Sequence, residues 1–227
     1  MRGLDSEGNW RTPFNPRASN HRNDDYCEGT AWQWTWFVPH DVDGLVELMG
    51  GRDAFIGKLD SLFTADSKLE GESTSVDISG LIGQYAHGNE PSHHIAHLYN
   101  YVGQPWRTQE IVDEVLHTLY FNNPDGLSGN EDCGQMSAWY ILNAMGFYQV
   151  CPGKPVYSIG RPLFNEATVH LKDGKSFKVI AHNNSRDNKY VRSIVLNGNK
   201  LETPFFTHQD IVDGGTLELT MGSEPLK

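Results

Sequence analysis

The sequence lacks the features that identify several large classes of protein. It has no run of Lys and Arg residues, and its formal net charge is −11. Binding to a phosphate backbone needs a basic face, so nucleic acid is not an expected partner. No apolar run is long enough to span a bilayer and no signal peptide is visible, so no membrane partner is predicted. The first residues lead straight into a polar loop, as in the middle of a longer chain, so the compartment stays unknown.

Motifs for nucleotide, zinc and serine-nucleophile chemistry are also missing. There is no Gly-rich phosphate loop, no GxSxG elbow and no Ser/His/Asp spacing. The three cysteines form neither a CxxC pair nor a zinc spacing, and an odd count argues against a complete disulfide framework. Cys27 and Cys133 each stand beside an acidic residue, and we expect both to be small buried residues that pack the wall of a site.

Acidity and aromatic content are the features that are present. Hydrophobic residues make up 38% of the chain and aromatic residues 11%, which is enough to form a folded core. An acidic and aromatic-rich protein suits neutral polyols such as sugars, or cations such as calcium. The expected ligand classes are therefore carbohydrate and divalent cation.

Helical and strand-like patterns occupy different parts of the chain. Apolar spacing and capping signals predict helices over residues 41–49, 53–63, 92–101, 108–120 and 135–145. Alternation predicts strands over residues 167–171, 177–181, 193–196 and 216–219, with hairpin turns at Asp173-Gly174 and Asn197-Gly198. The sequence thus predicts an α+β protein in which an antiparallel β unit follows the helices.

The segment from Gly129 to Tyr140 places adjacent carboxylates on a glycine-bounded loop that leads into an apolar helix. A helix N-terminus stabilises an ionised carboxylate, which suits a base that activates water. Glu131 and Asp132 are both candidates, and a simple helix-capping cluster is an equally good interpretation of the pattern.

Glu28 precedes Gly29 and a tryptophan cluster that includes Trp32 and Trp34. A carboxyl group beside indole rings is desolvated, which favours its neutral form and suits a general acid. The indoles can also stack on the apolar face of a pyranose. A glutamate that only favours a helix N-terminus is the alternative.

The segment from Tyr85 to His94 gathers histidine, asparagine and glutamate. Asn89, Glu90 and backbone carbonyls are hard oxygen ligands suited to calcium. Zinc is not favoured, because His93 and His94 are neighbours and do not share a helix face. A loop that precedes a helix capped by Ser92 is the alternative interpretation.

These clusters together resemble glycoside hydrolase family 92, the calcium-dependent exo-acting α-mannosidases. The matching stretches cover nearly the whole chain: Gly8–Phe14 (GNWRTPF), Tyr26–Asp41, His87–His94 (HGNEPSHH) and Gly129–Tyr140 (GNEDCGQMSAWY), with similarity again at Asn183–Ser185 and His208–Gly215. The resemblance implies residues 1–152 as the helical part of an incomplete (α/α)6 catalytic barrel. Residues 153–227 would then be an antiparallel β unit packed on it.

The resemblance also implies roles for individual residues. Inverting hydrolysis uses one carboxyl as acid and another as base, about 6.5–9.5 Å apart. By motif Glu28 would be the acid and Asp132 the base, which leaves Glu131 in a supporting role. Asn130 stands where family members often carry Asp, so it would assist by hydrogen bonding. The implied metal is Ca²⁺, with Asn89, Glu90 and Asp132 as ligands, and the implied sugar contacts are Trp32, Trp34, His87, Glu90 and Gln135.

Family members are much longer, with a β-sandwich domain before the barrel. The implied partners are therefore a mannose-containing glycan, with an α-1,2 linkage as the implied preference, and the absent β-sandwich and barrel half. Apolar faces at the break also predict a homo-oligomer. The parent family suggests a secreted or periplasmic location. Alternatives are an inactive sugar- or calcium-binding fragment, another inverting glycosidase on an α-toroid, and a helical scaffold without a site.

Overall fold

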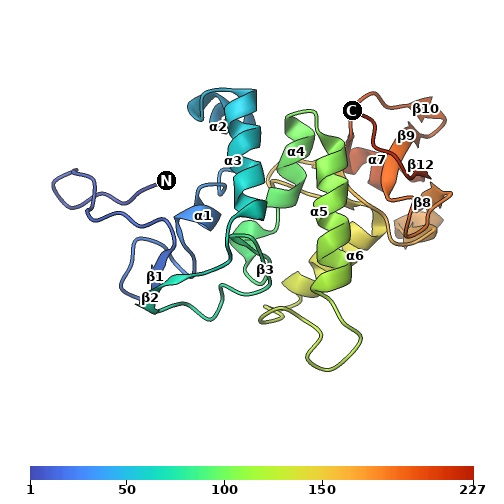
Figure 1. The fold of residues 1–227 in the computed structure, drawn as a ribbon. Coiled ribbons are helices and arrows are strands. Elements are labelled where there is room, and N and C mark those ends of the chain that lie inside the picture. The colour runs from blue at the N-terminus through green and yellow to red at the C-terminus, as the bar shows by residue number, and fades with distance from the viewer. The chain divides into compact units, whose positions relative to one another are not determined.

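The computed structural model describes all residues from 1 to 227 (Figure 1). The chain forms two compact units. Unit 1 comprises residues 1–93 and 121–136, and unit 2 comprises residues 94–120 and 137–227. The predicted boundary after residue 152 thus falls inside unit 2. None of the helices is both long and apolar enough to cross a membrane.

Unit 1 is built from short helices and two small strand pairs joined by long loops. Its elements are β1 (Ala18–Asn20), α1 (Ala31–Trp34), α2 (Val42–Leu48), α3 (Arg52–Thr64), β2 (Glu70–Ser73), β3 (Leu81–Ile82), β4 (Tyr85–Ala86) and the 3₁₀ turn η1 (Glu90–Ser92). β1 pairs with β2 in parallel, and β3 pairs with β4 in antiparallel register. Most of the residues singled out by the sequence therefore lie in loops of this unit.

The core of unit 1 confirms the predicted helices near residues 41–49 and 53–63. Asp41 caps α2, because its Oδ1 accepts the Gly44 N–H at 3.0 Å. The apolar stripe of α3 is buried, and Phe55 packs edge-on against Trp36 with ring centroids 5.3 Å apart. Aromatic pairs of this kind contribute to the core of a unit that contains little sheet.

Unit 2 combines helices with a five-stranded sheet and a three-stranded sheet. Its elements are η2 (Ile95–His97), α4 (Leu98–Tyr101), α5 (Pro105–Thr118), β5 (Phe147–Tyr148), β6 (Val156–Ile159), β7 (Glu166–His170), η3 (Lys172–Gly174), β8 (Ser176–His182), β9 (Tyr190–Leu196), β10 (Asn199–Lys200), β11 (Phe205–Thr207), α7 (His208–Val212) and β12 (Gly215–Gly222). Helix α6 (Gln135–Met145) starts in unit 1 and continues into unit 2, with the predicted bounds.

The predicted strands and hairpin turns of the five-stranded sheet are confirmed. Alternate residues such as Phe177, Val179 and Leu217 are buried in one core. Asp173-Gly174 and Asn197-Gly198 turn the chain between antiparallel neighbours, with φ of 62° and 75° in the first pair and 50° and 79° in the second. Asn, Asp and Gly tolerate this left-handed conformation, which explains their use here.

The expectation of a wholly antiparallel β unit is wrong for one pair of strands. The strand order is β10-β9-β12-β8-β7, and β12 runs parallel to β8 but antiparallel to β9. The last strand is inserted between two strands that run in opposite directions, so it must be parallel to one of them. Alternation within a strand reports burial and cannot report its neighbour.

The predicted helix over residues 92–101 is confirmed only in its last turn. The structure has two 3₁₀ turns, η1 and η2, followed by the single-turn helix α4. Ser92 lies inside η1 and does not cap it, because Asn89 is the N-cap. The mixed α+β class is confirmed, whereas the partial (α/α)6 toroid stays a prediction.

Candidate active site

Glu28 lies in a loop that the start of α1 holds in place. Thr30 caps this helix in a capping box: its hydroxyl accepts the Trp32 N–H at 3.2 Å, and its own N–H donates to the Gln33 Oε1 at 2.6 Å. Glu28 has a φ of 51°, a conformation that is uncommon for residues with a side chain. Its carboxyl is exposed, so the desolvation predicted from the nearby indoles is not found in this chain.

Trp34 supports the backbone beside Glu28. Its Nε1–H donates to the Cys27 carbonyl at 2.8 Å, and a Cβ on Gly29 would collide with the indole. Both Cys27 and Cys133 are exposed free thiols, which corrects the expectation that they are buried in the wall of a site. Their exposure follows from the open loops that carry them.

The loop after Gly129 carries three consecutive residues in the left-handed conformation. These are Asp132, Cys133 and Gly134, with φ of 50°, 55° and 93°. The loop joins α6 through the Gln135 N–H, which donates to the Asp132 carbonyl at 3.2 Å, and the Met136 N–H, which donates to the Glu131 carbonyl at 3.3 Å. Asn130, Glu131 and Asp132 are exposed. Backbone strain of this kind concentrates at functional sites.

His87 has a structural place in the interior of unit 1. Its side chain has 0% exposure, and its Nδ1 shares a hydrogen bond of 2.8 Å with the Tyr85 hydroxyl. Burial lowers the pKa of His87 well below its usual value, and the nearby His93 lowers it further, so the ring is neutral. The ring is fully buried in this chain, and the sugar contact of His87 stays a prediction.

Asn89 uses both ends of its amide within unit 1. Its Oδ1 accepts the Glu90 N–H at 3.2 Å as the N-cap of η1, and its Nδ2 donates to the Glu28 carbonyl at 2.8 Å. The amide therefore holds backbone at both ends, and its role as a metal ligand stays a prediction.

Glu90 connects the two candidate catalytic residues electrostatically. Burial raises the pKa of the Glu90 carboxyl, and the charge of Asp132, a hydrogen bond with that residue and the charge of Glu28 raise it further. Glu28 and Asp132 are thus both within electrostatic range of one carboxyl group. No group of three or more His, Cys, Asp and Glu side chains lies close enough to hold a metal ion alone.

Gln135 contacts a second buried histidine. The His93 Nε2 lies 3.0 Å from the His87 carbonyl, and its Nδ1 lies 3.0 Å from the Gln135 Nε2. Because a carbonyl can only accept, the His93 Nε2 carries the proton and its Nδ1 accepts from the Gln135 amide. The sequence placed Tyr85 and His93 in the predicted cluster but gave neither of them a role in the site. The alternation of Tyr85 and His87 at the end of a strand was the signal that places both rings on one face.

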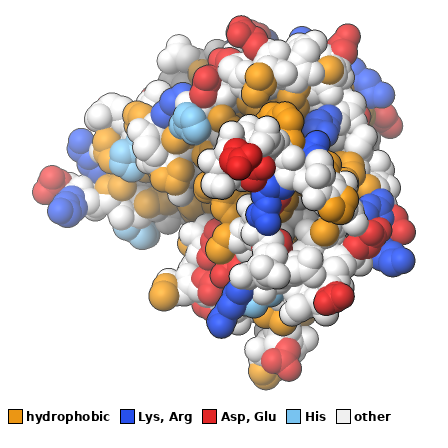
Figure 2. Space-filling model, turned by 90° about the vertical axis from the view of Figure 1, so that its left-hand side faces the viewer, with side chains coloured by type: hydrophobic (Ala, Val, Ile, Leu, Met, Phe, Trp, Pro, Cys, Tyr) orange, Lys and Arg blue, Asp and Glu red, His pale blue; other side chains and the backbone are white.

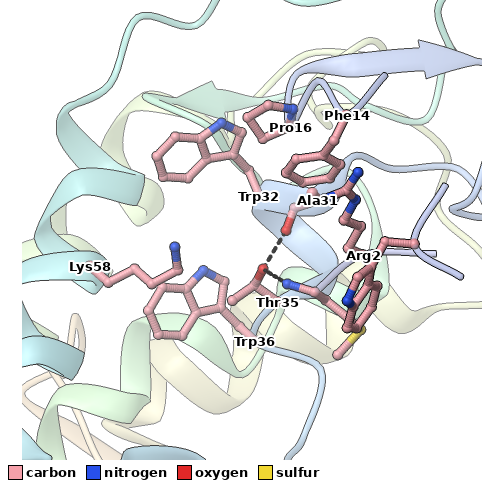
Figure 3. A pocket seen from close by; sticks show the side chains of 10 residues that line it. Arg2, Phe14, Pro16, Ala31, Trp32, Thr35, Trp36 and Lys58 are labelled. Atoms are coloured by element: carbon pink, nitrogen blue, oxygen red, sulfur yellow. Dashed lines mark hydrogen bonds between the residues drawn. The ribbon is translucent and has the colours of Figure 1, made fainter. Parts of the chain in front are cut away.

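Trp32 lines an apolar cavity of about 410 Å³ in unit 1. Figure 3 shows the rings of Trp32, Trp36 and Phe14 around it, with Lys58 reaching in from α3. The Lys58 ammonium lies 5.8 Å from the centroid of the Trp32 ring.

In Figure 2 hydrophobic side chains reach the surface between charged ones. The large exposed hydrophobic residues of the chain include Trp10, Phe14, Leu48, Val76 and Phe121.

Exposed carboxylates on strained loops around a shared third carboxyl define a candidate hydrolase site, and comparison with known proteins gives the family. Residues 1–223 match the family model described as "Glycosyl hydrolase family 92 catalytic domain". The chain belongs to glycosyl hydrolase family 92.

Solved structures resemble the whole chain. One is the family GH92 alpha-mannosidase BT3965 from Bacteroides thetaiotaomicron in complex with mannoimidazole, at 44% identity and a TM-score of 0.92, covering 100% of this chain and 30% of that one. Another is the inverting mannosidase BT2199 from the same organism, at 43% identity and a TM-score of 0.84, covering 99% and 31%. An uncharacterized secreted glycosidase of Arthroderma benhamiae is 32% identical over 200 residues, which are 87% of this chain and 24% of that protein. The chain thus spans about a quarter to a third of these relatives.

Proposed function

We propose that this chain carries the acid and base of an inverting exo-α-mannosidase, with Glu28 as general acid and Asp132 as general base. The observation that carries this proposal is the shared electrostatic environment of Glu90, which interacts with both carboxylates. The family membership and the solved relatives, named as alpha-mannosidases, support the sugar.

In the proposed reaction Glu28 donates its proton to the glycosidic oxygen while Asp132 removes a proton from the attacking water. Water attacks the anomeric carbon from the face opposite the leaving group, so the configuration inverts. The bond to the leaving oxygen breaks as the bond to the water oxygen forms. We expect the two carboxyl groups about 6.5–9.5 Å apart, which leaves room for the water. Asn130 would orient that water by a hydrogen bond.

Calcium is the cofactor that we propose. Ca²⁺ takes about six to eight oxygen ligands, and Glu90 and Asp132 offer carboxylates of the right chemistry. Burial raises the pKa of Glu90 most and the negative charges of Asp132 and Glu28 add to it, and a cation would offset those charges. When bound, the ion would contact the 2- and 3-hydroxyls of mannose and favour a distorted ring. The remaining ligands would be water, sugar and regions of the relatives that lie outside this chain.

A second candidate is a mannose- or calcium-binding fragment without turnover. It is favoured by the exposure of Glu28 and Asp132, together with a chain that covers only 30% of an enzyme it resembles. We also propose an α-1,2 preference and a secreted location. We propose that a preceding β-sandwich and barrel half complete the site, and that two copies associate through exposed apolar residues.

Hydrolysis of 4-nitrophenyl α-mannoside and α-1,2-mannobiose by the chain tests these proposals. We expect Asp132→Asn to lower kcat/KM about 10²–10⁴-fold on both substrates, and Glu28→Gln to do so on the disaccharide, whose leaving group needs a proton. Glu131→Gln is the matched control and should stay within about threefold, because it changes a neighbouring exposed carboxylate.

Chelation with EGTA followed by Ca²⁺ addition tests the metal, and NMR of the first-formed mannose anomer tests inversion. Binding of mannose without turnover would support the fragment instead. Turnover that ignores EGTA would contradict the calcium role, and release of α-mannose would contradict inversion.

A further inference from the structure

The two residues assigned to catalysis share an unusual backbone. Glu28 has a φ of 51° and Asp132 a φ of 50°, although neither is glycine. Each such residue carries a conformational cost and persists only when its surroundings hold it there. Both are in loops, so regular hydrogen bonding of a helix or strand does not fix either one.

One short segment contacts both loops. The Asn89 Nδ2 donates to the carbonyl of Glu28 itself at 2.8 Å. Four residues later, the His93 Nδ1 accepts a hydrogen bond from the side-chain amide of Gln135 at 3.0 Å. The backbone N–H of Gln135 donates to the carbonyl of Asp132 at 3.2 Å. Asn89 and His93 therefore each lead to one of the two strained residues.

The segment itself is anchored in the interior of unit 1. The backbone N–H groups of His87 and Gly88 donate to the carbonyls of Gly80 and Ser79, at 3.1 and 3.0 Å. A Cβ on Gly88 would collide with the Ser79 hydroxyl and the Ser128 carbonyl, so no other residue fits there. The imidazoles of His87 and His93 lie 5.2 Å apart, and both side chains are buried.

We propose that residues 87–93 form a brace for the two loops, in which Asn89 is a positioning residue for Glu28 and His93, through Gln135, is a positioning residue for Asp132. Both assignments rest on the catalytic roles proposed above. Because one segment of seven residues is bonded to the loops of both Glu28 and Asp132, it fixes the distance between the proposed acid and base. Neither Asn89 nor His93 needs to touch the sugar.

Leaving-group dependence separates the two halves of the brace. The chain is assayed with α-1,2-mannobiose, whose leaving group needs a proton, and with 2,4-dinitrophenyl α-mannoside, whose leaving group does not. Asn89→Ser keeps a capping oxygen for Glu90 but cannot reach the Glu28 carbonyl. We expect it to lower kcat on the disaccharide about 10–100-fold with KM nearly unchanged, and to lower kcat on the aryl substrate by less than about threefold.

His93→Phe keeps a buried ring and removes both hydrogen bonds of His93. We expect kcat to fall about 10–100-fold on both substrates, because the base is misplaced in either case. Added azide, a nucleophile that needs no base, should restore turnover of the aryl substrate. The control is Asn100→Ser in unit 2, which also removes an amide donor to a buried backbone carbonyl, at 2.7 Å from Ile159 O. It should lower the melting temperature without changing the ratio of the two kcat values.

Amide exchange tests the brace without turnover. His93→Phe should speed hydrogen exchange of the Gln135 backbone N–H at least about tenfold. Asn89→Ser should speed exchange of the Trp34 indole N–H beside Glu28 by a similar factor. Equal losses on both substrates for Asn89→Ser, no azide rescue for His93→Phe, or unchanged exchange in both variants would overturn the brace. If the wild-type chain shows no turnover, the proposed function fails, and the exchange rates still decide whether the brace exists.

Discussion

Both units bury histidines in hydrogen-bonded networks, but the networks end in different places. In unit 2 the fully buried His97 places Nδ1 at 3.0 Å from the Ser158 hydroxyl and Nε2 at 2.9 Å from the Asn143 Oδ1. Asn100 also donates to Ser158, at 2.7 Å. These partners all lie in the interior, so the network closes on itself.

In unit 1 the network leads out to an exposed loop. Tyr85, His87 and His93 are buried, but the next partner is Gln135, which adjoins the left-handed turn of Asp132. The comparison teaches that a buried histidine is not by itself a sign of function. A buried network that leads to the backbone of a strained residue with an exposed carboxyl group is the more informative pattern.

The largest expected effect concerns the core of unit 2, which we interpret as scaffold. Phe177 has 0% exposure and packs in the core of the five-stranded sheet. Phe177→Ala should lower the free energy of unfolding by about 3–5 kcal/mol, because it removes buried apolar area and leaves a cavity. Chemical denaturation measures this. The matched control is Phe121→Ala in a loop of unit 1, where the side chain is 57% exposed and the loss should stay below about 1 kcal/mol.

The next effect uses the pH dependence of the closed network. Burial lowers the pKa of His97 to about 4, so the folded state takes up its proton later than the unfolded state as the pH falls. His97 therefore stabilises the fold above its ordinary pKa of about 6.5, and this contribution is lost as the pH falls from there through 4. Between pH 7 and pH 5 the loss should be roughly 2 kcal/mol.

Denaturation of His97→Asn and His170→Asn at both pH values isolates this contribution. His170 is an exposed histidine of the same unit, so its replacement should leave the pH dependence as in the wild type. His97→Asn should flatten it. Equal pH dependence in all three proteins would show that the closed network does not titrate with folding.

The smallest effect compares two helix caps, one in each unit. Thr30 and Thr207 both form capping boxes, with Gln33 and Asp210 respectively. Each Thr→Ala change should cost about 1 kcal/mol of stability. Only Thr30→Ala should also lower turnover, because Thr30 fixes the backbone two residues after Glu28. Thermal melting and mannosidase assays measure the two properties, and equal turnover in both variants would remove the functional contrast between the units.

Local patterns in the sequence predicted the regular elements well. The apolar stripe that gives α3 and the run that gives α6 are complete within one helix, so each could be found from its own residues. The turn at Asn197-Gly198 was equally local. The helix predicted from Ser92 is confirmed only over Leu98–Tyr101, because Asn89 caps a 3₁₀ turn where the longer helix was expected to begin.

The sequence motifs identified the family, whereas the roles of the individual site residues stay predictions. The motifs around Glu28 and Asp132 gave the family, which the comparisons show. The use of the Asn89 amide depends on a contact with Glu28 across a separation of 61 residues. No spacing rule within either segment contains that contact.

The sequence by itself determined the family, the helices and hairpin turns, and the residue types available for acid, base and cation binding, because each is carried by short-range spacing. Only the tertiary structure decided which side chains are buried, that β12 enters between β8 and β9, and that residues 87–93 reach both strained loops. The physical reason is that packing and long-range hydrogen bonds select among partners that local periodicity leaves open.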